Sequence, residues 1–309
     1  MSKENTAVTK KKIKRCKEDV VFDAACFIIL TLVLFVVAYP LYWVIISSIS
    51  APSAVSSGKV LLHPIGFTLK GYAEVFKNDQ VMRGFLNSLI ITFCGVMVNL
   101  IVTLPTSYAL SRSNFSGKKP ITIFYLITMF FGGGLIPTYL VIQRLQMLNT
   151  IWALILPGCL SVYNMIVART FFKSNISEEL YEAAEIDGCT QARFFFQIAL
   201  PLSKAIIASL VLYSGVGHGN SYFSALVYIS DKAKYPLQLV LRNILITNQT
   251  ALSQTATTAA ARAALQEKQQ LIDVMKYSLI IISSIPVLVM YPLVQKHFVK
   301  GVMIGSMKG

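Results

Sequence analysis

Charged side chains are scarce in this sequence. Only 14% of its 309 residues are Asp, Glu, Lys or Arg, whereas an ordinary soluble domain carries about 25%. Hydrophobic residues make up 55% of the chain, and its mean hydropathy is +0.62. The polar side chains are too few to cover a water-soluble protein of this size, and a disordered chain would be less hydrophobic. Lipid is therefore the expected solvent for much of the molecule.

Residue types that build metal and catalytic sites are also few. The chain has five cysteines without a CxxC pair and three histidines that lie far apart in sequence. This pattern does not favour a zinc site or a histidine-based triad. The sequence also lacks the G-x-x-x-x-G-K-[ST] loop that cradles nucleotide phosphates. We therefore expect no catalytic residue, no metal site and no cofactor on this chain.

Long uncharged runs are the main feature that is present. A bilayer core of about 30 Å takes roughly 20 apolar residues as a helix. Six runs meet that length, over residues 24–46, 85–110, 120–142, 145–168, 205–230 and 277–295. Little more than Gln143 and Arg144 separates the third from the fourth, which predicts a tight helical hairpin. The expected fold class is all-α, a polytopic membrane protein with six transmembrane helices.

The distribution of basic residues predicts the orientation. With the amino terminus in the cytoplasm, 17 of the 28 Lys and Arg residues lie in cytoplasmic segments, clustered near span ends. The others are spread mainly over two long outer loops, 47–83 and 231–276. Since Lys and Arg accumulate on the cytoplasmic side, both termini are expected there. The basic tail is then a topology anchor near anionic headgroups, which disfavours nucleic-acid binding.

These assignments divide the chain into three parts. We expect a basic cytoplasmic tail over residues 1–19, a six-span transmembrane domain over 20–295 and a cytoplasmic tail over 296–309. Within the second outer loop, residues 254–270 are rich in helix-forming Ala, Gln, Arg and Lys. They predict a short polar helix outside the bilayer.

The inner segment 171–204 is the most informative part of the chain. Ser177 followed by two glutamates predicts a helix start, and Gly188 can take the left-handed conformation that ends it. Thr190 can cap a second helix, which Leu200-Pro201 is expected to break. The product is a cytoplasmic helix–turn–helix with small side chains on one face. From the residues alone, docking to another surface and a solvated connector both remain open.

Sequence motifs add a family resemblance. The pattern Glu182-Ala183-Ala184, Asp187-Gly188 and Ile198-Ala199-Leu200-Pro201 resembles the EAA motif of permease subunits in binding-protein-dependent ABC importers. Five further stretches are similar to the carbohydrate branch of that family or to its complex-saccharide subgroup: residues 87–89, 108–112, 133–139, 235–238 and 298–309.

The resemblance implies a multi-subunit assembly. It implies a second homologous permease subunit and a dimer of ATPase subunits that binds ATP and magnesium. It also implies an extracellular or periplasmic solute-binding protein, a sugar substrate and a location in the bacterial cell membrane. The ATPase-coupling residues would be those of an EAA coupling helix: Glu182, Ala183, Ala184, Asp187 and Gly188. The tail over 305–309 would reach the ATPase interface.

Polar residues inside the spans are candidates for the substrate pathway. Sugars are held by aromatic faces and by amide or hydroxyl hydrogen bonds. The candidates are Asn99, Tyr163, Asn164, Tyr213, His218 and Asn220. Each could instead form a helix–helix hydrogen bond. Relatives often carry Trp where this chain has Gly219, and its role could pass to Tyr222 or Phe223.

Other functions remain open at this level. The nearest is an ABC permease for a non-sugar solute. A secondary transporter or channel would fit six spans, but it would usually bury ionisable residues along an ion path. An intramembrane enzyme would need carboxylates or a metal cluster within the spans, and the six runs contain no carboxylate.

Overall fold

The computed structural model describes residues 17–251 and 259–305, and the regular structure of this part of the chain is entirely helical. The expected all-α class is confirmed. The elements are α1 Lys17–Ser48, α2 Pro52–Ser56, α3 Lys70–Lys77, α4 Asp79–Ser111, α5 Lys118–Phe130, α6 Leu135–Arg144, α7 Trp152–Ile155, η1 Leu156–Gly158, α8 Val162–Asn175, α9 Glu178–Ile186, α10 Gln191–Phe194, the π-turn η2 Phe195–Ala199, α11 Leu200–Leu202, α12 Lys204–Gly219, α13 Tyr222–Tyr228, η3 Lys232–Lys234, α14 Leu237–Ala251 and α15 Ala259–Gly305.

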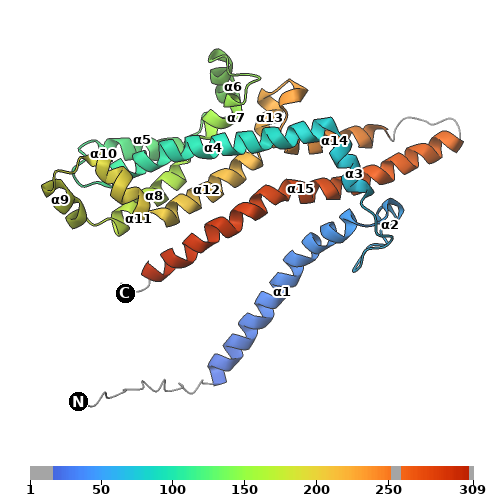
Figure 1. Ribbon diagram of the computed structural model, residues 1–309, viewed down its shortest axis with the longest axis horizontal. Coiled ribbons are helices and arrows are strands. Elements are labelled where there is room, and N and C mark those ends of the chain that lie inside the picture. The colour runs from blue at the N-terminus through green and yellow to red at the C-terminus, as the bar shows by residue number, and fades with distance from the viewer. Residues whose placement is uncertain (1–16, 252–258, 306–309) are drawn as a thin grey trace.

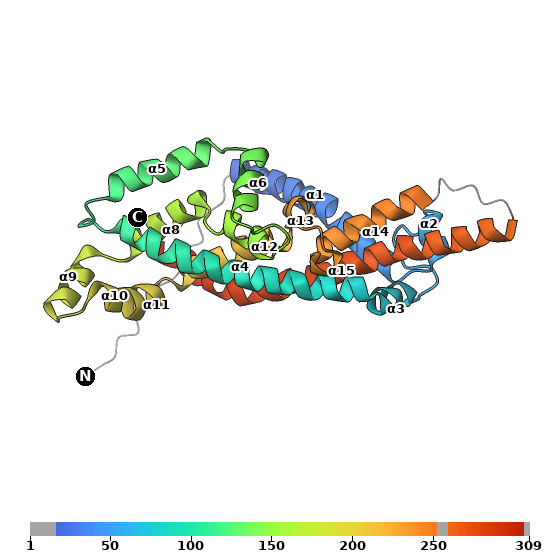
Figure 2. The same cartoon turned by 90° about the horizontal axis from the view of Figure 1, so that it is seen from above.

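Helix α4 is the central element of the bundle. It packs against α8, α12 and α14, while α15 packs against α12, α3 and α1. The long helices run along the molecule (Figure 1), with α9, the start of α1 and the end of α15 towards one end. Helices α2, α3 and α14 lie towards the opposite end (Figure 2). The segment 171–204 is thus far from the two long loops.

Three of the six apolar runs lie within single long helices. Helices α1 and α4 have 32 and 33 residues, with Pro40 and Pro105 inside them. Helix α15 has 47 residues, of which Gln269–Pro292 are long and apolar enough to cross a membrane. All three exceed the roughly 20 residues that a bilayer core requires.

The run 120–142 forms two helices rather than the expected one. Helices α5 and α6 meet at 115°, and between them lie Gly132, Gly133 and Gly134, the last with φ +82°. Each glycine costs a helix roughly 1 kcal/mol relative to alanine, so the chain bends there. The expected tight hairpin at Gln143 and Arg144 is also wrong, because the turn continues to Ile151 before α7 begins.

The runs 145–168 and 205–230 are broken too. Helices α7 and η1 meet α8 at 51°, with Ser161 capping α8 through the N–H of Asn164. Helix α12 ends at Gly219, and α13 starts at Tyr222. By length and composition, the described helices provide three spans, or up to six if each bent pair counts as one; the third such pair is Gln191–Leu202 with Lys204–Gly219, and α13 is not part of it.

The expected polar helix over 254–270 is not a separate element. From Ala259 onward these residues form the beginning of α15, while residues 252–258 lie outside the described part of the chain. The basic tail before Lys17 and the last residues, 306–309, also lie outside it.

Close packing of α3 on α15 fixes one end of the bundle. A Cβ at Gly71 would lie 2.6 Å from Ser278 Oγ and 2.8 Å from Val274 Cγ1. Val75 of α3 belongs to a buried cluster with residues of α4, α14 and α15. The absence of a side chain at Gly71 therefore permits this contact.

Replacing Gly71 by leucine tests this packing. Overpacking a tight contact costs about 1–3 kcal/mol, so Gly71→Leu should lower the melting temperature of the detergent-solubilised protein by about 3 °C or more. Gly132→Ala is the control, because no described atom lies within 4 Å of a Cβ built there. An unchanged melting temperature for Gly71→Leu would contradict the close approach.

Candidate functional site

The helix–turn–helix of segment 171–204 is built by the expected local interactions. Ser177 Oγ accepts the N–H of Leu180 at the start of α9. Gly188 has φ +73°, a conformation that glycine adopts without strain. Thr190 caps α10 by accepting the N–H of Arg193. These three structural predictions are confirmed.

The end of this segment differs from the expectation. Leu200-Pro201 does not break the second helix, because helical structure continues through a π-turn to Leu202. The direction changes by 80° between Leu202 and Lys204, where α12 begins. Pro201 lies two residues after the π-turn, close to the end of this helical stretch.

Four of the five expected coupling residues are exposed on or directly after α9, and the fifth packs towards the core. Glu182, Ala183, Asp187 and Gly188 are exposed, and Ala184 is half-buried against the protein core. Ile186 is 87% exposed, the highest value among the large hydrophobic residues whose exposure the structure describes. Sequence reasoning missed Ile186, although a large apolar residue between Glu185 and Asp187 was a visible signal.

The opposite face of α9 rests on aromatic side chains. Tyr181 is only 6% exposed, and its ring centroid lies 5.3 Å from that of Phe194. The same buried cluster contains Tyr108 at the end of α4 and Phe172 of α8. Helix α9 is therefore packed firmly onto the ends of two membrane-spanning segments.

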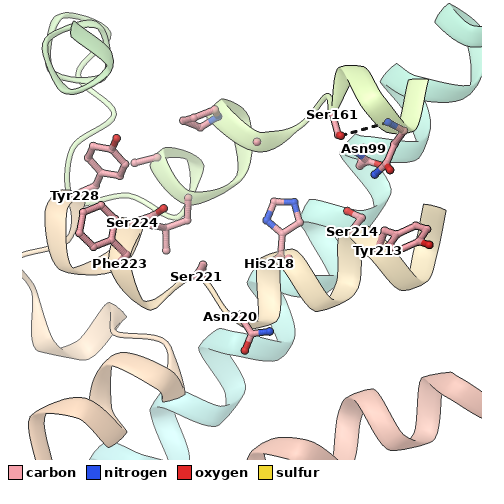
Figure 3. A pocket seen from close by; sticks show the side chains of 16 residues that line it. Asn99, Ser161, Tyr213, Ser214, His218, Asn220, Ser221, Phe223, Ser224 and Tyr228 are labelled. Atoms are coloured by element: carbon pink, nitrogen blue, oxygen red, sulfur yellow. Dashed lines mark hydrogen bonds between the residues drawn. The ribbon is translucent and has the colours of Figure 1, made fainter. Parts of the chain in front are cut away.

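A cavity of about 500 Å³ lies between α4, α7, η1, α8, α12 and α13. Figure 3 shows side chains from these elements directed towards it. Five of the expected pathway residues line its wall: Asn99, Asn164, Tyr213, His218 and Asn220.

Other expected residues lie elsewhere. Tyr222 and Tyr163 do not belong to the cavity wall, whereas Phe223 does. Gly219 faces a separate crevice of about 60 Å³, beside Thr92 and Met290. Helical periodicity alone could not decide these orientations, because α12 ends at Gly219 and the chain changes direction before Tyr222.

Three residues of the cavity wall carry a buried side-chain oxygen without a hydrogen-bond partner among the described residues. Asn99 Nδ2 donates to the carbonyl of Cys159 at 2.9 Å, but its Oδ1 is buried without a partner among the described residues. Ser214 Oγ and Ser221 Oγ are likewise buried and unpartnered within the described chain. None of the described residues in the wall is Asp, Glu, Lys or Arg. The wall formed by the described residues is therefore polar but carries no carboxylate, lysine or arginine side chain.

The imidazole of His218 packs closely against a glycine. A Cβ at Gly95 of α4 would lie 2.5 Å from His218 Cδ2, so only glycine leaves room for the imidazole. The side chain is 9% exposed, and Figure 3 shows it directed from α12 towards η1. Within the described residues, no three His, Cys, Asp or Glu side chains are grouped to hold a metal ion.

Comparisons with known proteins identify the family. No family model matches the chain. The polygalacturonan/rhamnogalacturonan transport system permease protein YtcP of Bacillus subtilis is 35% identical over 288 residues, which cover 93% of this chain and 98% of that protein. Protein LplC of the same organism is 38% identical over 289 residues, or 94% and 95% of the two chains.

More distant relatives are also carbohydrate permeases or importers. The galactooligosaccharides transport system permease protein GanQ of Bacillus subtilis is 29% identical over 293 residues, covering 92% of this chain and 94% of that protein. The crystal structure of a bacterial ABC transporter involved in the import of the acidic polysaccharide alginate contains a chain that is 27% identical. It superposes with a TM-score of 0.81 and covers 92% of this chain and 99% of that one. The protein belongs to the permease subunits of carbohydrate ABC importers.

Proposed function

We propose that this permease subunit takes up an oligosaccharide or another complex sugar across the bacterial cell membrane. It works with a second homologous permease, an ATPase dimer and an extracellular or periplasmic solute-binding protein. ATP and magnesium bind to the ATPase subunits, and both termini of this chain face the cytoplasm. The printed functions of the relatives support the sugar class.

The observation that carries this proposal is the construction of α9. Its buried Tyr181 fixes one face to the bundle, while Glu182, Ala183 and Ile186 face outward. Small side chains allow close approach to a partner groove, and an exposed apolar side chain can serve as its anchor. We assign this surface to the ATPase subunit and name α9 the coupling helix.

The cavity supplies the second half of the proposal. Its volume falls within the range of about 300–1,000 Å³ typical of small-molecule sites. Tyr213 and Phe223 are 60% and 51% exposed, so both rings are open to stack against a sugar ring. Asn164 and Asn220 also line the wall and are not buried, so their carboxamides can form hydrogen bonds with sugar hydroxyls. The second permease would provide the facing wall of the pathway.

Coupling then takes place through conformational change. ATP-driven closure of the ATPase dimer would displace α9, and the spans would alternate between inward-open and outward-open states. The direction of transport follows from the different affinity of the sugar for the two states.

The coupling helix can be tested by two substitutions. Gly188→Val forces a β-branched residue into a left-handed conformation, and Glu182→Lys reverses an exposed charge on the docking surface. Both should reduce uptake of labelled oligosaccharide to background, while immunoblots show unchanged subunit levels in the membrane. Glu18→Lys on α1, outside the docking surface, is the control. Wild-type uptake in either variant would contradict the assignment.

Cross-linking tests the partner directly. In a chain whose native cysteines are replaced by serine, Ala183→Cys should cross-link to a cysteine in the ATPase groove. It should also resist a membrane-impermeant thiol reagent in intact cells. Labelling of this position from outside the cell would contradict the proposed topology.

Two exposed tyrosines provide a matched test of the cavity. Tyr213 lines it and Tyr163 does not, although their exposed fractions are 60% and 61%. Losing one stacking ring costs about 1 kcal/mol, so Tyr213→Ala should raise the sugar concentration for half-maximal uptake roughly fivefold. Tyr163→Ala should leave it unchanged. Equal effects of the two variants would remove Tyr213 from the pathway.

A further inference from the structure

Arg112 connects the end of α4 to the coupling helix. It follows the last residue of α4, and its side chain is only 12% exposed. Its Cζ lies 4.3 Å from the ring centroid of Tyr181 on α9. The rings of Tyr108 and Phe194 lie at 5.7 and 6.0 Å. The guanidinium is therefore surrounded by aromatic rings at cation–π distance.

The same guanidinium contacts the first turn of α9. Arg112 Nη2 lies 3.3 Å from Glu178 Oε1, and the neighbouring Ser113 hydroxyl donates to that same oxygen. Glu178 and Tyr181 are three residues apart on α9, so they share one face of the helix. Arg112 thus holds both an acidic and an aromatic side chain of the coupling helix.

The backbone around Arg112, at the end of α4, is also held by hydrogen bonds from neighbouring helices. Arg169 Nε of α8 donates to the carbonyl of Leu110 at 2.9 Å. Lys118 Nζ donates to the carbonyls of Arg112 and Ser113 at 3.3 and 3.0 Å. These bonds satisfy carbonyls at the end of α4 that have no partner within the helix. The backbone that carries Arg112 is consequently held by α8 and by the start of α5.

From this point α4 leads to the cavity as one helix, which contains Pro105 on the way. Asn99 lies in the cavity wall, and Gly95 accommodates His218. Both belong to the same helix. The 13 residues from Arg112 to Asn99 span about 20 Å at 1.5 Å per residue. A displacement of α9 that is passed to Arg112 therefore reaches the sugar cavity through one helix.

We propose that Arg112 is a positioning residue for energy coupling, which fastens the coupling helix to α4 so that movement of α9 also moves the cavity wall. This inference rests on the proposed docking of α9 to the ATPase. A lysine would keep the charge but lose the planar group that both stacks on rings and pairs with a carboxylate. The contact should therefore require arginine.

The test uses the complete importer reconstituted in proteoliposomes with its solute-binding protein and the transported sugar. Arg112→Lys and Tyr181→Leu should each lower the amount of sugar transported per ATP hydrolysed by about tenfold. The cross-link between position 183 and the ATPase should persist in both. Tyr181→Phe keeps the ring and should restore the wild-type ratio. Arg144→Lys is the matched control, since Arg144 is exposed on α6, away from α9.

A wild-type ratio in both Arg112→Lys and Tyr181→Leu would overturn the proposal. So would an equal loss of cross-linking, ATP hydrolysis and transport in both, because Arg112 would then serve assembly only. A missing cross-link in the importer that carries Ala183→Cys together with the native Arg112 and Tyr181 would instead contradict the docking of α9. The two proposals can therefore fail separately.

Discussion

The contact between α9 and the end of α4 is the constraint on which the functional arrangement depends. A helix of nine residues is too short to be stable alone in water, and α9 exposes most of its polar side. Its position is set by Tyr181 and Ala184, which pack into the buried cluster formed with α4, α8 and η2. This packing leaves the opposite face free and connects it to the bundle. The proposed docking surface and the proposed link to α4 thus belong to one short helix.

Breaks in the helices, rather than the long helices alone, form the cavity. Pro157, Gly158 and Ser161 come from the interruption between α7 and α8, and Asn220 and Ser221 from that between α12 and α13. Irregular backbone at membrane depth is tolerated only where it is buried in protein or lines a water-filled space. The breaks that contradict the simple six-helix interpretation bring polar backbone and side chains to the cavity.

Local chemistry was predictable from the sequence. Ser177, Gly188 and Thr190 each act within a few residues of their own position, so the caps and the turn could be identified without tertiary structure. The helix breaks were harder to predict, because an apolar run can contain glycine and still form one continuous membrane helix. The three consecutive glycines Gly132, Gly133 and Gly134 indicate a break, but the length of the run 120–142 favoured a single span. The contact between Arg112 and Glu178 joins residues 66 positions apart, and no local rule predicts it.

The central claim is that α9 and α4 move together. Spin labels at Ile101 of α4 and Glu185 of α9, both exposed, would report their separation in the assembled importer. The distance distribution should remain the same in the nucleotide-free and the vanadate-trapped states, while accessibility at Tyr213 changes as the cavity opens or closes. A shift of the Ile101–Glu185 distance between the two states would contradict this account.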